Sequence, residues 1–178
     1  MSDLRILEMP LPGLYVLECP QHQDKRGDLT KLFHIHALKE QGLDFHPAEI
    51  FVTRSKAGVL RGMHFQIGES AHDKLIFCSG GRVLDVVVDV RPNSINFNRP
   101  FAVELNETSN RALFINKGYA HGFLALEGES SMTYATNTVH SPSHDRGVLW
   151  SSIAFDWPIQ EPILSLRDSQ HAPIKQNT

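Results

Sequence analysis

The sequence predicts an all-β protein, either a β-sandwich or a closed β-barrel. Its apolar segments are short and rich in Val, Ile, Leu and Phe, and 12 glycines and 10 prolines punctuate the spaces between them. No segment has the apolar period of a helix of ordinary length. Many short strands divided by turns are typical of sandwiches and barrels. A chain of 178 residues commonly forms one domain with a substantial core, so we expect a single domain over residues 1–178.

The N-terminal part of the chain is expected to hold two strands, a turn and a short helix. Residues 14–18 form a short apolar run and are the first expected strand. Residues 21–24 are polar and turn-like, whereas residues 29–35 are apolar enough for a second strand. Residues 37–42 can form one or two helical turns, since Gly42 is a suitable C-terminal stop.

The rest of the chain is expected to be a series of strands with an irregular tail. Ser79-Gly80-Gly81 predicts a hairpin turn, and the tail from Trp157 to Asp168 is punctuated by prolines. The expected strands are residues 48–55, 59–66, 74–78, 82–90, 101–105, 113–115, 122–126, 131–136 and 147–150.

The strand at residues 59–66 is unusual because it carries both an arginine and a histidine. Strict alternation places Arg61 and His64 on opposite faces. Gly62 lies between them, and a glycine inside a strand often marks a bulge or a close backbone approach. A bulge there would bring both side chains to one pocket. The alternative is a solvent-facing Arg61 and a hydrogen-bonded core His64.

Two aspartates share one face of the strand at residues 82–90. Asp85 and Asp89 alternate with Leu84, Val86 and Val88. If that face is buried, both carboxylates need partners. The alternative is an exposed sheet face, which fits Asp89 near the strand end better than Asp85.

Composition narrows the function only coarsely. A net charge of −3 and a pI near 6.3 argue against a general nucleic-acid binder but allow a local basic pocket for a phosphorylated ligand. Cys19 and Cys78 are widely spaced and form no metal or redox motif, so a reduced, cytoplasmic protein is the simplest expectation. Residues 1–5 lack the features of a signal peptide, and no apolar run is long enough to span a membrane.

One group of residues has the spacing of a metal site. His34, His36 and Glu40 resemble the ligand spacing of metal-dependent cupins. We expect a surface histidine pair instead, because the change from strand to helix near Ala37 aims Glu40 elsewhere, and we expect no bound metal.

Several segments, in order along nearly the whole chain, resemble one known family. Each is short, but the ordered set is specific. The segments are Asp24-Lys25-Arg26-Gly27, residues 58–66 (G-V-L-R-G-M-H-F-Q), Lys74-Leu75, residues 81–89, residues 118–123 (G-Y-A-H-G-F), residues 142–147, Trp157-Pro158 and residues 164–168. Together they resemble the cupin-fold nucleotide-sugar epimerases typified by dTDP-4-dehydrorhamnose 3,5-epimerase.

This resemblance implies a fold, an activity and a set of partners. The fold would be a cupin jelly roll with short peripheral helices, and the protein a homodimer that exchanges strands between subunits. The activity would be that of an isomerase without metal or other cofactor. Its substrates would be nucleoside-diphosphate 4-keto-6-deoxy sugars, epimerised at C3, C5 or both through an enolate, in deoxysugar biosynthesis.

The resemblance also implies residue roles. His64 would be the general base with Asp168 as its carboxylate partner, Tyr134 the general acid, and Lys74 the residue beside the 4-keto oxygen. A neutral histidine suits such proton transfer at neutral pH. The substrate-binding residues would be Arg26, Arg61, His121, Glu49, Phe51, Asp145 and Arg167, with Asp85 behind His121.

Departures from the family pattern lie where the substrate would be held. Glu49-Ile50-Phe51 stands where the family has Gln-Asp-Asn, and His140 lies near the position of a family tyrosine. The nucleotide is therefore open between dTDP, CDP and GDP. Two other functions also remain open, a sugar 3,4-ketoisomerase and a non-catalytic cupin that binds nucleotide sugars.

Overall fold

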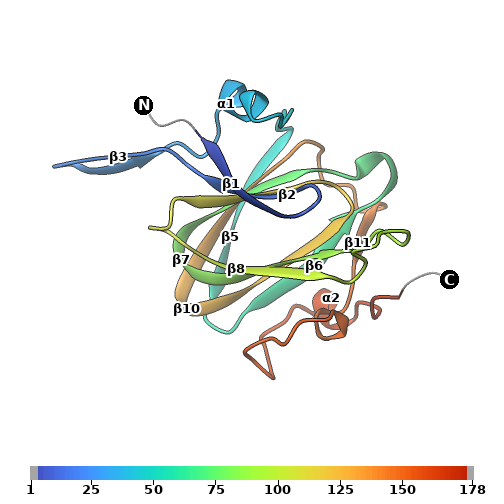
Figure 1. Cartoon of the computed structure of the whole chain (residues 1–178). Coiled ribbons are helices and arrows are strands. Elements are labelled where there is room, and N and C mark those ends of the chain that lie inside the picture. The colour runs from blue at the N-terminus through green and yellow to red at the C-terminus, as the bar shows by residue number, and fades with distance from the viewer. Residues whose placement is uncertain (1–3, 176–178) are drawn as a thin grey trace.

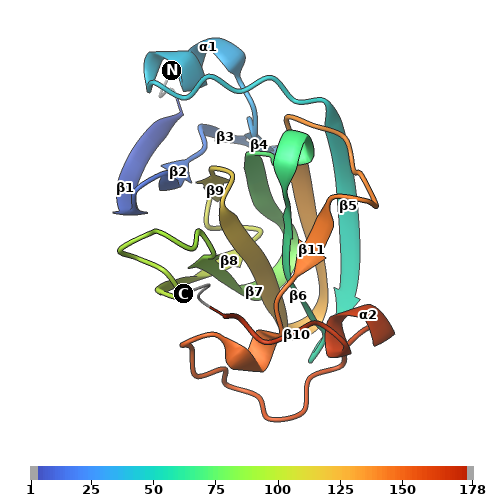
Figure 2. The ribbon, with the colours of Figure 1, turned by 90° about the vertical axis from the view of Figure 1, so that its right-hand side faces the viewer.

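A computed structural model describes residues 4–175 of the chain. Nine strands form a sheet that folds over itself into two layers, and two strands form a separate ribbon (Figures 1 and 2). The strands are β1 (Arg5–Leu11), β2 (Leu14–Glu18), β3 (Gln21–Asp24), β4 (Gly27–Thr30), β5 (Glu49–Lys56), β6 (Leu60–Gln66), β7 (Lys74–Asp89), β8 (Pro100–Asn106), β9 (Arg111–Ile115), β10 (Tyr119–Thr136) and β11 (Asp145–Gly147). The all-β prediction is confirmed.

The helical elements are short and lie outside the sheet (Figure 1). They are α1 (Ile35–Glu40), α2 (Leu166–Ser169) and the single 3-10 turns η1 (Gly68–Ser70) and η2 (Trp150–Ser152). No helix among residues 4–175 has both the length and the apolar character needed to cross a membrane.

Two long strands, β7 and β10, run through both layers. β7 pairs with β9 along residues 74–77 and with β8 along residues 82–88. β10 pairs with β6 in its first half and with β5 in its second half. β7 and β10 also pair with each other in antiparallel register along most of their length. Each of them therefore belongs to one layer at its start and to the other at its end.

The largest apolar cluster packs around these two strands. Ile76 and Val87 contribute from the two halves of β7, Phe123 and Met132 from those of β10, and Leu113 from β9; all are fully or almost fully buried. Alternation sends side chains of this kind to one face within each half of β7 and β10, and the register shifts between the two strands bring both halves to the same core. Their removal from water stabilises the sandwich. The strands that carry the site described below are thus anchored in the core.

The expected hairpin turn at Ser79-Gly80-Gly81 is wrong, because β7 continues through it. At Gly81, φ is +70°, and a Cβ atom would lie 2.5 Å from the carbonyl oxygen of Glu129. These glycines therefore allow close backbone contact where β7 bends against β10. The two strands expected at residues 122–126 and 131–136 are likewise one strand, β10, which runs through the residues between them.

The N-terminal predictions need three corrections. β1 was not expected, and residues 21–24 form a strand, β3, rather than a turn. β3 is polar, but one edge of its backbone pairs with β4 in the two-stranded ribbon. The strand expected at residues 29–35 ends at Thr30, and His34 then caps α1 by accepting a hydrogen bond from the Ala37 N–H. The helix itself was predicted.

Another short strand differs from its prediction. Residues 147–150 were expected to be a strand, whereas β11 ends at Gly147 and the 3-10 turn η2 begins at Trp150. β11 pairs with β6, which places Gly147 opposite His64.

Gly62 produces the expected bulge in β6. His64 lies opposite His121 and Arg61 lies opposite Phe123, so β6 has one residue more than β10 in this interval. At Gly62, φ is +139° and a Cβ atom would lie 2.6 Å from Gly122 Cα. Because of the bulge, Arg61 and His64 face the same cavity.

Both aspartates on one face of β7 are buried and partnered, so the exposed alternative is wrong. Asp89 Oδ1 accepts a hydrogen bond from Arg91 Nε at 2.9 Å. Asp89 Oδ2 accepts one from Ser94 Oγ at 2.6 Å. Asp85 pairs with a histidine in the site.

Candidate active site

A cavity of about 320 Å³ lies where β5, β6, β7, β10 and α2 meet. This volume suits a small-molecule site. Its lining residues are Glu49, Phe51, Thr53, Arg61, His64, Phe65, Gln66, His72, Lys74, His121, Tyr134, Thr136, His140, Asp145, Ser165, Arg167 and Asp168. The structure therefore brings together every residue predicted as catalytic and every predicted substrate-binding residue except Arg26.

His64 and Asp168 form a tight histidine–carboxylate pair in this cavity. His64 Nε2 lies 2.6 Å from Asp168 Oδ1, and the carboxylate is buried. Burial raises the pKa of Asp168, but the hydrogen bond from His64 and the backbone N–H of Gly62 outweigh it and hold the pKa below its ordinary value. An ionised Asp168 accepts a hydrogen bond from the Nε2–H of neutral His64. The lone pair of His64 is then on Nδ1, which is the basic nitrogen.

The short helix α2 positions this carboxylate. Ser165 is its N-cap, and Ser165 Oγ accepts a hydrogen bond from the Asp168 N–H at 3.0 Å. A serine three residues before an acid is a common start of a helix. The Gly62 N–H also lies 3.4 Å from Asp168 Oδ2. The tail is therefore held against β6 at the residue that pairs with His64.

A second buried histidine–carboxylate pair lies beside the first. His121 Nε2 lies 2.8 Å from Asp85 Oδ2, and both residues are buried. His121 is directly opposite His64 in the ladder between β10 and β6. The edge of its ring also faces Tyr134, with centroids 5.9 Å apart. Both predicted histidines thus reach the cavity from neighbouring strands.

Lys74 is a buried cation at the start of β7. Its Nζ donates a hydrogen bond to the carbonyl oxygen of His64 at 2.9 Å. Burial lowers the pKa of Lys74 to about 8, although the charges of Asp145 and Asp85 raise it in part. Lys74 therefore carries a positive charge at neutral pH in a buried position, where a charge acts strongly on developing anions.

Tyr134 lies on the wall formed by β10 and β5. Its ring stacks on Phe51, with centroids 4.7 Å apart and planes 8° apart. Burial raises the pKa of Tyr134 well above its ordinary value, and the charge of Asp85 adds to this rise. The hydroxyl is therefore protonated at neutral pH and can act as a proton donor.

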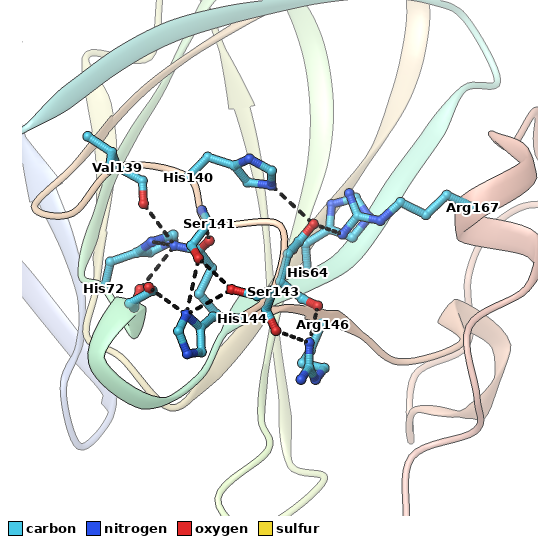
Figure 3. A network of polar contacts seen from close by, with 12 residues as sticks. His64, His72, Val139, His140, Ser141, Ser143, His144, Arg146 and Arg167 are labelled. Carbon is cyan, nitrogen blue, oxygen red and sulfur yellow. Dashed lines mark hydrogen bonds and ion pairs between the residues drawn. The ribbon is translucent and has the colours of Figure 1, made fainter.

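Four charged residues line the cavity at what we call its rim, namely Glu49, Arg61, Asp145 and Arg167. Figure 3 labels Arg167 and the neighbouring His140. Asp145 Oδ2 lies 2.6 Å from Arg167 Nη2 and 3.3 Å from His140 Nε2. Glu49 Oε2 accepts a hydrogen bond from the His140 N–H at 2.8 Å. On β6, Arg61 Nε donates to Ser55 Oγ at 2.9 Å. The rim thus holds two fixed guanidinium groups and two carboxylates.

Arg26 does not reach the cavity of its own chain. It lies in the turn of the ribbon formed by β3 and β4, where it pairs with Asp24 at 2.6 Å and its side chain is 84% exposed. Figure 1 shows β3 extending away from the sheet.

Several cavity residues were not predicted from the sequence, among them Gln66 and His72. Figure 3 labels His72. Gln66 Oε1 accepts a hydrogen bond from the Ser141 N–H at 2.6 Å, which leaves Gln66 Nε2 to donate to His72 Nδ1 at 3.0 Å. Burial, and then the charge of Lys74, lower the pKa of His72 to about 4, so it is neutral. Alternation from His64 would have placed Gln66 on the cavity face.

Within residues 4–175, the structure offers one group of three side chains close enough to share a metal ion. These are His64, Asp168 and His171, whose ligand atoms all lie within 4.8 Å of one another. The spacing noted at His34, His36 and Glu40 does not produce such a group among the described residues.

Comparison with known proteins gives consistent matches over nearly the whole chain. Residues 8–176 match the family described as dTDP-4-dehydrorhamnose 3,5-epimerase. The protein of that name from Shigella flexneri is 35% identical over 168 residues, which cover 93% of this chain and 93% of the relative.

Solved structures agree with this match. The dTDP-4-dehydrorhamnose 3,5-epimerase of Bacillus anthracis, described with TDP and PPi bound, superposes with a TM-score of 0.92 at 32% identity, covering 96% of this chain and 99% of that one. A 3'-monoepimerase from Streptomyces bikiniensis, in complex with dTDP-quinovose, gives a TM-score of 0.88 at 29% identity, covering 94% and 87%. These are cupin jelly rolls, so the cupin prediction is confirmed.

Proposed function

Because the chain belongs to the dTDP-4-dehydrorhamnose 3,5-epimerase family, we propose that His64 is the general base of its reaction. The protein is an isomerase that epimerises a nucleoside-diphosphate 4-keto-6-deoxy sugar in deoxysugar biosynthesis. The proposal rests above all on the 2.6 Å pairing of His64 Nε2 with Asp168 in a cavity that also holds Lys74 and Tyr134.

The first step is removal of a proton beside the ketone. In a 4-keto sugar, the hydrogens on C3 and C5 are both α to the carbonyl, so loss of either gives an enolate. His64 Nδ1 accepts the proton, since its Nε2–H is held by Asp168. The ionised carboxylate of Asp168 then stabilises the imidazolium and keeps the ring in one tautomer.

Lys74 stabilises the charge that this step creates. Negative charge develops on O4 as the proton leaves. A buried ammonium group interacts more strongly with that anion than with the neutral ketone, which lowers the barrier. The hydrogen bond from Lys74 Nζ to the His64 carbonyl keeps the cation beside the base.

Tyr134 returns a proton to the opposite face of the enolate. Inversion requires that the incoming proton arrives from the side away from the base. The buried hydroxyl of Tyr134 is protonated, and Phe51 fixes its ring on the β5 side of the cavity. His121, held by Asp85, is the second histidine at the sugar.

The arginines of the rim bind the diphosphate. Arg61 and Arg167 line the cavity, and guanidinium groups suit phosphate oxygens. Arg26 completes this set in a homodimer, where the ribbon of β3 and β4 reaches the cavity of the partner. The exposure of Arg26 and the extension of the ribbon away from its own sheet support this assembly.

The nucleotide is dTDP or a close analogue, held at the rim by Glu49, Phe51, Asp145 and Arg167. This choice is tested by measuring KM for the same 4-keto-6-deoxy sugar attached to dTDP, to CDP and to GDP. The dTDP sugar should have the lowest KM. We further propose one cupin domain over residues 1–178, in the cytoplasm, which is supported by the free thiols of Cys19 and Cys78.

The experiment is proton NMR of the parent protein and of His64→Asn with dTDP-4-keto-6-deoxyglucose in D₂O. The parent should exchange C3–H, C5–H or both, and His64→Asn should slow this exchange by about 10²–10⁴-fold. His46→Asn, at an exposed position away from the cavity, is the control. Equal exchange rates in the parent and in His64→Asn would refute the role of His64.

A further inference from the structure

His171 lies beside the His64–Asp168 pair with its side chain 13% exposed, and the proposed reaction does not use it. Its ring meets that of His64 edge to face, with centroids 5.6 Å apart. Its Nε2 lies 3.6 Å from Asp168 Oδ1 and, among the described residues, has no hydrogen-bond partner. A buried polar atom without a partner costs about 1–3 kcal/mol, and such atoms often mark a place for an ion or a water molecule.

Contacts between the C-terminal tail and residues 147–149 fix the position of His171. A Cβ atom at residue 147 would lie 2.2 Å from His171 Nε2, so the ring fits only because Gly147 has no side chain. The next residue, Ala172, accepts a hydrogen bond from the Leu149 N–H at 2.9 Å. Gly147 itself pairs with His64 across β11 and β6. The backbone thus holds His171 next to the base.

We propose that His64, Asp168 and His171 form an inhibitory site for Zn²⁺. Two imidazole nitrogens and a carboxylate oxygen are typical zinc ligands, and a site with three protein ligands leaves one position for water. In tetrahedral zinc sites, ligand atoms lie about 3.3 Å apart. The distance between His171 Nε2 and Asp168 Oδ1 is already 3.6 Å, and the tighter His64–Asp168 pair opens by less than about 1 Å to admit the ion.

Zinc at this site would inactivate the base by fixing the wrong tautomer. In the active form, the single proton of neutral His64 is on Nε2 and is donated to Asp168, which leaves Nδ1 free. Zinc takes the lone pair of Nε2, so the proton moves to Nδ1. Nδ1–H cannot accept a proton from the sugar. This consequence, though not zinc binding itself, rests on the proposed role of His64.

The binding test is an equilibrium zinc titration of the full-length protein against a chromophoric chelator. The parent should bind one Zn²⁺ per chain through this site, and His171→Ala should bind it at least about tenfold more weakly. His140→Ala is the matched control, because His140 and Asp145 form another histidine–aspartate pair in the cavity, at 3.3 Å. Equal affinity of the parent and His171→Ala would overturn the site, as would an equal loss in His140→Ala.

Two further measurements distinguish zinc binding at this site from inhibition of the base His64. Histidine ¹⁵N NMR should show the His64 proton on Nε2 without zinc and on Nδ1 with it. The rate of deuterium exchange into the sugar, normalised to each variant without zinc, should fall with zinc in the parent and much less in His171→Ala. Binding without inhibition would overturn the inhibitory effect and count against His64 as the base, whereas no binding would overturn the site alone.

Discussion

The ring of Phe51 lies parallel to the ring of Tyr134, with centroids 4.7 Å apart and planes 8° apart. The two residues are also direct partners in the ladder between β5 and β10. An aromatic residue thus stands directly opposite Tyr134 on the wall of the cavity. Offset aromatic stacking contributes about 0.5–1.5 kcal/mol beyond burial, so Phe51 restricts the ring that carries the proposed acid.

Tyr134→Phe should separate the two proton transfers. Without the hydroxyl, His64 still removes the sugar proton, but the opposite face receives none. We expect the epimer to form about 10²–10⁴-fold more slowly, while deuterium exchange with retained configuration continues. Chiral analysis of the product beside exchange NMR measures both. Tyr15→Phe, whose ring packs on Phe114 outside the cavity, is the control; a parent-like rate of epimer formation in Tyr134→Phe would exclude this tyrosine as the acid.

Lys74 should set the alkaline limit of activity. Burial lowers its pKa to about 8, so the cation is present below that pH and is lost as the pH rises through it. We therefore expect kcat/KM to fall above pH about 8 in a pH–rate profile. Lys74→Arg should abolish this alkaline limb, because arginine stays charged, and Lys74→Met should lower kcat/KM by about 10²–10³-fold at pH 7.

Lys39→Met, at an exposed position in α1, is the control for this series and should keep the parent profile. An alkaline limb that persists unchanged in Lys74→Arg would show that another group titrates there.

Gly62→Ala should destabilise the fold more than an ordinary substitution at positive φ. Its Cβ would lie 2.6 Å from Gly122 Cα, in a backbone with φ +139°. Strain and overpacking together cost about 2–5 kcal/mol. At Gly128, φ is +59° and no atom lies within 4 Å of a Cβ, so Gly128→Ala should cost only about 1–2 kcal/mol. Urea denaturation compares the two, and equal losses would contradict the close contact.

Arg26 should act in the cavity of a partner subunit. Arg26→Ala and His64→Asn chains, carrying different tags and co-expressed, can be purified as mixed dimers by using both tags in turn. One of the two sites then has both His64 and Arg26, so a mixed dimer should show about half of the parental activity by two-fold symmetry. If Arg26 served its own chain, neither site would be complete and no activity would return. A monomeric protein would yield nothing after the second purification.

Local sequence patterns predicted much of the sheet, and the resemblance to a known family predicted most of the cavity wall. Alternation and turn residues located β5, β6 and α1, and Gly62 indicated the bulge that unites Arg61 with His64. The family resemblance implied that His64, Lys74, Tyr134 and Asp168 share one site, and the structure has all four in one cavity.

The remaining features depend on contacts between distant residues. Gly80 and Gly81 signal a turn locally, but pairing of β7 with β10 on both sides keeps the strand continuous. The polar segment at residues 21–24 becomes a strand only because β4 lies beside it. His171 carries no motif, and its place beside His64 depends on the space above Gly147.

The long pairing of β7 with β10 divides the site into parts of unequal local stability. Lys74, Asp85, His121 and Tyr134 all lie on these two strands, so they lose their arrangement only when the sheet itself unfolds. Asp168 lies on the tail beyond the last strand and contacts β6 through a few bonds. Such segments open at lower free energy than the core. Heating should therefore abolish turnover before the far-ultraviolet signal of the sheet disappears, and amide hydrogen exchange should be faster in α2 than in β10.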